Sequence, residues 1–276
     1  MPQQNDLKRI ARQHLETDRL LGVDFVPIKT PQSEPAPEPA AAAEIEVNIP
    51  PGPVQPSTGT RKPTSLFEAA SPAQSVPRRS RQEKADALEA LRTRHDETCP
   101  HCTTATAHTQ TVFGEGAPDA ELIFIGEAPG EQEDRTGRPF VGRAGRKLDE
   151  IIQAMGLARP DVYIANVLKS RPMGNRTPLP TEVEQCAAFL AEQIRIIQPK
   201  VIVGLGGPAV KWLLGTNVGI TRLRGQWATF TDAEVAVPVM PTFHPAYLLR
   251  NYTPDTRGKV WSDMQQVMAY LQPASE

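Results

Sequence analysis

One stretch of the sequence, residues 126–149, combines the residue types from which ligand sites are built. It carries glycines, prolines and arginines together with the carboxylates of Glu127 and Glu133. An apolar run precedes the stretch and a helical pattern follows it, so it connects a predicted strand to a predicted helix. Phe140 lies in its middle, where a large aromatic side chain is unusual among solvated charges. We therefore interpret the stretch as a ligand-binding loop rather than a plain surface loop.

Three further loops each follow an apolar run: Asn166–Asn175, Gly204–Gly207 and His244–Arg250. A single asparagine or histidine in such a loop is more often structural than functional. The carboxyl ends of parallel strands, however, meet at one edge of a sheet, where open α/β proteins bind ligands. The sequence therefore predicts a site at which the four loops converge.

Cysteines form a second group of chemically active residues. The chain has three, and two of them stand in the run Cys99-Pro-His-Cys102. Without a secretory signal, this spacing favours a metal or redox site over a structural disulfide.

The elements that position these residues alternate between strands and helices, which predicts a parallel sheet covered on both faces. We expect a three-layer α/β/α sandwich with a central four-stranded, mostly parallel sheet, in a domain of residues 81–276. Strands are predicted at Leu122–Ile125, Val162–Val167, Val201–Leu205 and Val235–Thr242. Helical patterns occur near 142–155, 181–197, 207–214 and 256–271.

The N-terminal part of the chain has a different composition. Residues 1–25 predict a short amphipathic helix, which is either a docking helix for a protein partner or an addition to the folded domain. Residues 26–80 hold many of the 28 prolines, mixed with Ala, Glu and Ser, and predict a disordered linker.

Charge and hydropathy exclude some classes of protein. The net charge of −2 excludes a globally basic nucleic-acid binder but not a local basic patch. No apolar run approaches the roughly 18 residues of a transmembrane helix, and the N-terminus has no apolar secretory segment. We therefore expect an intracellular protein without a membrane partner.

Several motifs between residues 95 and 271 resemble the family 4 uracil-DNA glycosylases, and they occur in the family's order and spacing. They are Thr109–Gly114, Gly126–Gly130, Gly137–Gly142, Asn166 with Lys169, Gly174–Pro178 and His244–Arg250. The resemblance implies an enzyme of base excision repair that hydrolyses the N-glycosidic bond of deoxyuridine in DNA and leaves an abasic site. The alternative is a non-catalytic uracil-DNA binding or polymerase-associated accessory module of the same fold.

The resemblance also implies roles for single residues. A glycosylase takes its base out of the helical stack into a pocket, where Phe140 would stack on uracil. Asn166 offers a donor and an acceptor that match the uracil edge, and Gly126 and Ala128 would contribute main-chain groups.

Catalysis is expected from three side chains. His244 would donate to the uracil oxygen that becomes negative as the bond breaks. Glu127 and Glu133 would orient water or stabilise the positively charged sugar. The sequence leaves open which carboxylate dominates.

DNA, single- or double-stranded, is the expected partner of a monomeric enzyme. Arg138 and Arg143 would contact phosphates. Leu248, Leu249 and Arg250 would enter the minor groove and fill the space that the base vacates.

The family resemblance further implies a [4Fe–4S] cluster held by four cysteines. Cys99, Cys102 and Cys186 match three of them, but Ser170 stands where the remaining cysteine is expected. We expect a bound but labile cluster, with Ser170 or His108 as the fourth ligand. A zinc site or no metal at all are the alternatives.

Overall fold

The computed structural model describes residues 79–105, 108–232 and 235–272. The predicted N-terminal helix (1–25) and nearly all of the predicted linker (26–80) lie outside these ranges. Within them, no helix is both long enough and apolar enough to cross a membrane.

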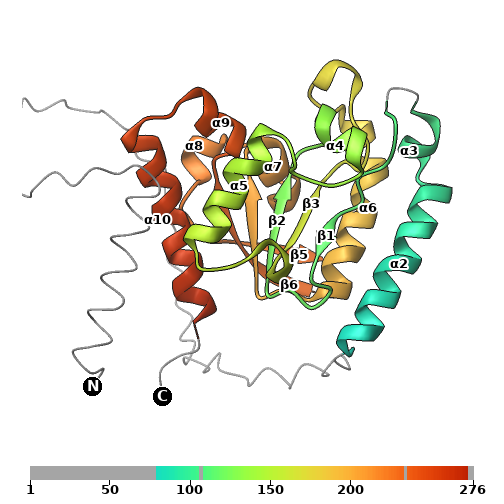
Figure 1. The fold of residues 1–276 in the computed structure, drawn as a ribbon, viewed down its shortest axis with the longest axis horizontal. Helices are drawn as coiled ribbons and strands as arrows, with labels where there is room; N and C mark the ends of the chain where they lie inside the picture. Colours follow the sequence, from blue (N-terminus) through green and yellow to red (C-terminus); the bar gives the residue numbers. More distant parts are fainter. Residues whose placement is uncertain (1–78, 106–107, 233–234, 273–276) are drawn as a thin grey trace, which may run out of the picture. The chain divides into compact units, whose positions relative to one another are not determined.

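A six-stranded sheet in the order β1-β3-β2-β4-β6-β5 forms the centre of the described residues (Figure 1). The four predicted strands are its parallel middle. They are β3 (Tyr163–Asn166), β2 (Leu122–Gly126), β4 (Val201–Leu205) and β6 (Val235–Thr242). Two antiparallel edge strands, β1 (Glu115–Gly116) and β5 (Ala228–Asp232), were not predicted. The sheet is thus wider than the predicted four strands.

Helices cover both faces of the sheet, as the α/β/α prediction required (Figure 1). Successive side chains of a strand point to opposite faces. Ile123 and Ile125 accordingly join one apolar core, with α2 (Arg81–Thr98), α6 (Pro180–Ile197) and α7 (Gly207–Leu214). Leu122 and Phe124 join the other, with α5 (Arg143–Ala154), α9 (Pro245–Arg250) and α10 (Pro254–Leu271). The remaining elements are short: α3 (Pro100–Thr104), α4 (Glu131–Thr136), α8 (Ile220–Leu223) and the 3₁₀ turns Arg159–Asp161 and Met173–Asn175.

The middle strands are nearly continuous runs of buried apolar residues, because both faces of a covered parallel sheet are buried. Their parallel direction places the ends of β2, β3, β4 and β6 at one edge. The loops that leave this edge are the four that the sequence singled out.

Candidate functional site

A cavity of about 630 Å³ opens at this edge of the sheet, and residues from all four loops line it. The first loop provides Glu127, Ala128, Pro129, Gly130, Glu133, Phe140 and Ala144. The others provide Asn166, Pro172, Asn175, Arg176, Gly206, Gly207, Pro208, Phe243, His244, Ala246, Tyr247 and Arg250, and α8 adds Ile220 and Thr221. The predicted convergence of the loops is confirmed.

Phe140 forms one wall of this cavity in a constrained conformation. Its φ of 50° is unusual for a residue other than glycine, and its ring is buried. A Cβ atom on Gly126 would lie only 2.5 Å from the ring and 2.4 Å from Asn166 Oδ1. Gly126 does not line the cavity itself, but its missing side chain lets Phe140 and Asn166 approach each other.

Asn166 is the last residue of β3 and pairs with Gly126 of β2. Its side chain is almost completely buried, and its Oδ1 has no hydrogen-bond partner among the described residues. An unpaired buried amide oxygen costs free energy. The site thus holds a polar group that is ready to pair with a ligand.

The two predicted carboxylates differ sharply. Glu133 accepts main-chain hydrogen bonds from Val141, Gly142 and Gly130 at 2.9, 2.8 and 3.2 Å, so it fastens the first loop to itself. The carboxylate of Glu127 has no hydrogen bond or ion pair within the described part of the chain, and burial raises its pKa. Glu127 is therefore the carboxylate available to a water molecule or a substrate.

His244 precedes α9, and its Nδ1 accepts a hydrogen bond from the backbone N–H of Ala246 at 3.1 Å. Burial, and to a smaller extent Arg250, lowers the pKa of His244 to about 4. At neutral pH the ring is therefore uncharged, and with Nδ1 as an acceptor the proton is on Nε2. Gly206, at a φ of 87°, admits His244 at this place, since a Cβ would lie 2.9 Å from His244 Cβ.

The ring of His244 also lies next to that of Phe140, with centroids 5.6 Å apart and planes tilted by 33°. A flat ligand that stacks on Phe140 would therefore lie close to His244, since both residues line the cavity. This arrangement suits a planar heterocycle with an oxygen that can accept a hydrogen bond.

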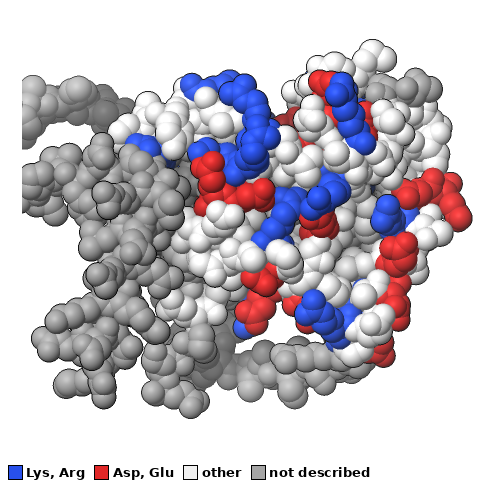
Figure 2. Space-filling view, viewed as in Figure 1, with Lys and Arg blue, Asp and Glu red and all other residues white. Residues whose placement is uncertain are grey.

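Charged side chains surround the mouth of the cavity. Figure 2 shows Lys and Arg on both sides of a largely uncharged surface at this edge of the sheet. Arg250 lines the cavity and is exposed, and Arg143, also exposed, begins α5 directly after the first loop. Arg138 instead forms a bidentate ion pair with Glu115, at 2.7 and 2.8 Å, so its charge is already matched.

The prediction that Leu248 contacts DNA is wrong. Its side chain is 3% exposed and packs in the core beside α5 and α10. Its neighbour Leu249 is half-buried. Two adjacent residues of a short helix point in different directions, and in α9 the side of Leu248 faces inward.

Some cavity residues had no predicted role. Tyr247 is partly exposed at the mouth, and Asn175 and Arg176 come from the loop before α6. All three lie inside motifs that the sequence singled out. Their place in these motifs could have identified them as cavity residues.

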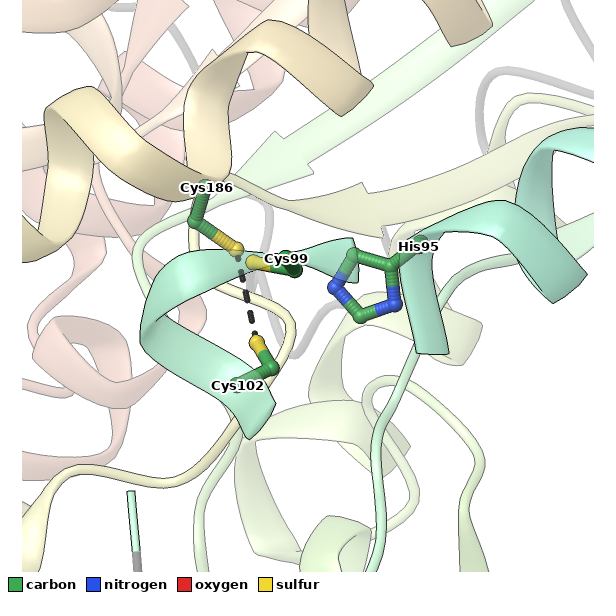
Figure 3. Close-up of side chains that lie close together, drawn as sticks. All are labelled: His95, Cys99, Cys102 and Cys186. Carbon is green, nitrogen blue, oxygen red and sulfur yellow. Dashed lines mark hydrogen bonds between the residues drawn. The ribbon is translucent and has the colours of Figure 1, made fainter. Parts of the chain in front are cut away.

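The three cysteines converge away from the cavity, where they meet a histidine (Figure 3). Cys99, Cys102, Cys186 and His95 each offer a ligand atom, and these atoms all lie within 4.8 Å of one another. We call these four residues the Cys–His cluster. All four are buried, and the cysteines are unpaired by disulfides. The cluster could bind a metal.

Neither predicted fourth ligand belongs to this group. His108 is absent from it, whereas His95, which the sequence analysis overlooked, is present. Ser170 lies beside the cluster, with its hydroxyl 3.5 Å from Cys102 Sγ. The signal for His95 was its place one helical turn before Cys99, since residues four apart share a helix face.

These residues do not fit a cluster held by four thiolates. Only three thiols are present, and the sulfurs of Cys102 and Cys186 lie 3.8 Å apart. In a [4Fe–4S] cluster each thiolate binds a different iron atom, so two metal atoms separate any two of these sulfurs. The observed separation, at which the two thiols are in hydrogen-bond contact, matches ligands that share one ion rather than ligands of different irons.

Comparison with known proteins agrees with the geometry of the cavity. A model of the uracil DNA glycosylase superfamily matches residues 113–265. The type-4 uracil-DNA glycosylase of Thermotoga maritima is 45% identical over 174 residues, which are 63% of this chain and 89% of that protein. Those of Sulfurisphaera tokodaii and Archaeoglobus fulgidus are 42% and 40% identical, over 61% of this chain and 78% and 86% of theirs.

Proposed function

The chain belongs to the type-4 uracil-DNA glycosylases of the uracil DNA glycosylase superfamily, and we propose that it removes uracil from DNA in base excision repair. In this reaction the bond between C1′ of the deoxyribose and N1 of uracil breaks. Uracil leaves with the bonding electrons and takes up a proton of the attacking water. The hydroxyl of that water adds to C1′, which leaves an abasic site.

One observation carries the proposal: a single cavity brings together Phe140, Asn166 and His244. A base flipped out of the DNA can stack on the ring of Phe140. The buried amide of Asn166 pairs with uracil N3–H and O4, which satisfies its free oxygen. Cytosine presents the opposite pattern at these two atoms and would leave the amide unpaired.

His244 supports the bond-breaking step as a neutral donor. As the bond lengthens, negative charge develops on uracil, including its O2. The Nε2–H of His244 donates to that oxygen, because Nδ1 is held as an acceptor by Ala246. The hydrogen bond strengthens as charge builds up, so it favours the transition state over the bound substrate.

Glu127 acts on the attacking water. Its unpaired carboxylate accepts a hydrogen bond from the attacking water and faces the positive charge that develops on the sugar. Glu133 acts indirectly, since its three main-chain hydrogen bonds hold the loop that carries Phe140.

DNA is held at the mouth of the cavity. Arg143 and Arg250 bind phosphates, and Leu249, with Tyr247 beside it, fills the space left by the flipped base. Because recognition is centred on a flipped base, both single- and double-stranded DNA serve as substrate. One chain supplies the whole cavity, which suits a monomer, and a protein partner for residues 1–25 stays a prediction.

The Cys–His cluster takes no part in these steps. None of its residues lines the cavity. Its cysteines come from α3 and α6 and the residue between α2 and α3, so a metal bound there would fasten these helices together.

The activity is tested with an end-labelled oligonucleotide that contains one deoxyuridine. After incubation with the protein, alkali should cleave the strand at the uracil position, in single strands and in U:G duplexes. A matched oligonucleotide with cytosine at that position should stay intact. An absence of alkali-labile sites after incubation with folded protein would favour the non-catalytic alternative.

The pH dependence should separate Glu127 from His244. Because burial raises the pKa of Glu127, the carboxylate takes up a proton as pH falls through a value above its usual range, and the single-turnover rate should fall with it. His244 stays neutral until pH approaches about 4, so it should cause no change near the ordinary histidine pKa. Glu127→Gln should lower the rate. It should also remove the dependence of the rate on pH in the range in which Glu127 is protonated.

The control is Glu131→Gln, which removes an exposed carboxylate of the same loop that does not line the cavity. It should keep the wild-type profile. If Glu127→Gln still loses rate at low pH as the wild type does, another group orients the attacking water.

Removal of residues 1–78 should leave uracil excision unchanged. Every motif and every cavity residue lies in the described part of the chain, from residue 79 onward. Single-turnover rates of the full chain and the truncated chain should agree on both kinds of DNA. A truncated protein with a native circular dichroism spectrum and a slower rate would place the N-terminal region in the site.

A further inference from the structure

We propose that His95, Cys99, Cys102 and Cys186 bind a single zinc ion, in place of the iron–sulfur cluster that the family resemblance implies. His95 supplies the fourth metal ligand in place of the absent thiolate. The inference concerns the fold of the enzyme and does not depend on the reaction proposed for the cavity.

The spacing of the ligand atoms suits one ion. Zinc binds thiolates at about 2.3 Å, so two sulfurs of a regular tetrahedron lie about 3.8 Å apart. Cys102 Sγ and Cys186 Sγ are 3.8 Å apart, and no pair of ligand atoms in the Cys–His cluster exceeds 4.8 Å. The Cys99–Cys102 spacing, C-x-x-C, is also typical of zinc sites.

His95 is oriented as a metal ligand. The ring is completely buried, and its Nδ1 lies 2.8 Å from Asp96 Oδ1. A carboxylate can only accept, so Nδ1 carries a proton, and in the neutral ring, the form that binds a metal, Nε2 keeps a lone pair. Nε2 is buried without a partner among the described residues, and Figure 3 shows a ring nitrogen facing the cysteines.

Asp96 completes a pattern that is common around zinc, in which a carboxylate fixes a ligating histidine. The hydroxyl of Thr111 donates to the same oxygen of Asp96 at 2.8 Å. The carboxylate is thereby held in place, and with it the orientation of the His95 ring.

The surroundings of the sulfurs complete the site. The backbone N–H of Lys169 donates to Cys186 Sγ at 3.2 Å. The Ser170 hydroxyl, 3.5 Å from Cys102 Sγ, can donate to that sulfur once it is a thiolate. Ser170 then supports a ligand instead of being one, which accounts for a serine at this position.

Metal content provides the first test. The full chain is produced and purified without oxygen, with iron and zinc both supplied, and its metals and acid-labile sulfide are measured. We expect about one zinc per chain, no sulfide, and X-ray absorption that fits three sulfurs and one nitrogen around zinc. Iron and sulfide in cluster amounts, or folded protein without metal, would overturn the proposal.

Variants identify the fourth ligand. His95→Cys should keep the zinc and convert its coordination to four sulfurs. Ser170→Ala and His108→Ala should each keep one zinc with three sulfurs and one nitrogen. Zinc that retains its nitrogen ligand in His95→Cys but loses it in His108→Ala would assign the position to His108 and overturn the role of His95.

Asp96→Ala tests the positioning of His95 without removal of a ligand. Loss of such a partner typically weakens metal binding about 10- to 100-fold. Competition with a chromophoric chelator should show this weakening, and Glu97→Ala, the exposed neighbour, should match the wild type. An unchanged zinc affinity in Asp96→Ala would contradict the orientation argued for His95.

Discussion

Replacement of His244 with alanine is expected to reduce the single-turnover rate of uracil excision by about 10²–10³-fold, the usual loss for one donor to a developing negative charge. The neutral ring, held by Ala246 and by burial, is preorganised to donate through Nε2. The hydrogen bond matters most in the transition state, so the affinity for uracil-containing DNA should change little. Rapid-quench assays at saturating enzyme measure the rate, and a binding assay measures the affinity.

His244→Gln offers a conservative comparison, because the amide of glutamine can also donate a hydrogen bond. It should recover part of the rate that alanine loses. His108→Ala, a change of a histidine outside the cavity, should keep the wild-type rate. A wild-type rate in His244→Ala, with the protein folded, would remove His244 from the bond-breaking step.

Replacement of Asn166 with alanine should have the other large effect, on the recognition of uracil. The variant leaves uracil N3–H and O4 without partners in a buried pocket. Each unsatisfied group costs about 1–3 kcal/mol, so the rate with uracil should fall by about 10²–10⁴-fold. The preference for uracil over cytosine should shrink with it, as measured on two oligonucleotides that differ only in that base.

Two features make this variant informative. The Oδ1 of Asn166 has no partner among the described residues, so its loss should not lower the melting temperature much. Asn175→Ala, which removes a second asparagine from the cavity lining, should keep the preference for uracil. A preference for uracil that survives in Asn166→Ala would show that another group recognises the base.

The sequence was sufficient to predict the middle of the sheet. Strands such as Val201–Leu205 are apolar on both faces and cannot be mistaken for surface segments. The edge strands gave no such signal, because β1 has two residues and β5 is only partly buried. The convergence of four loops followed from the parallel direction of the strands alone.

The details of the site depended on contacts that a sequence does not contain. Glu127 and Glu133 look equivalent in the loop, and only the main-chain hydrogen bonds of Glu133 separate them. Leu248 and Leu249 are alike in composition, and the packing of α9 decides which is buried. His95 lies one helical turn before Cys99, but its proximity to Cys186 joins two helices and is not visible in the sequence.

Lys169 lies between the Cys–His cluster and the cavity and contacts a residue of each. Its backbone N–H contacts Cys186, while its fully buried ammonium donates to the backbone oxygen of Asn166 at 2.9 Å and to Gln193 at 2.6 Å. The same residue thus contacts both the Cys–His cluster and Asn166 of the cavity. Binding linkage is reciprocal, so if zinc at the cluster changes the affinity for uracil-containing DNA, bound DNA must change the affinity for zinc by the same factor.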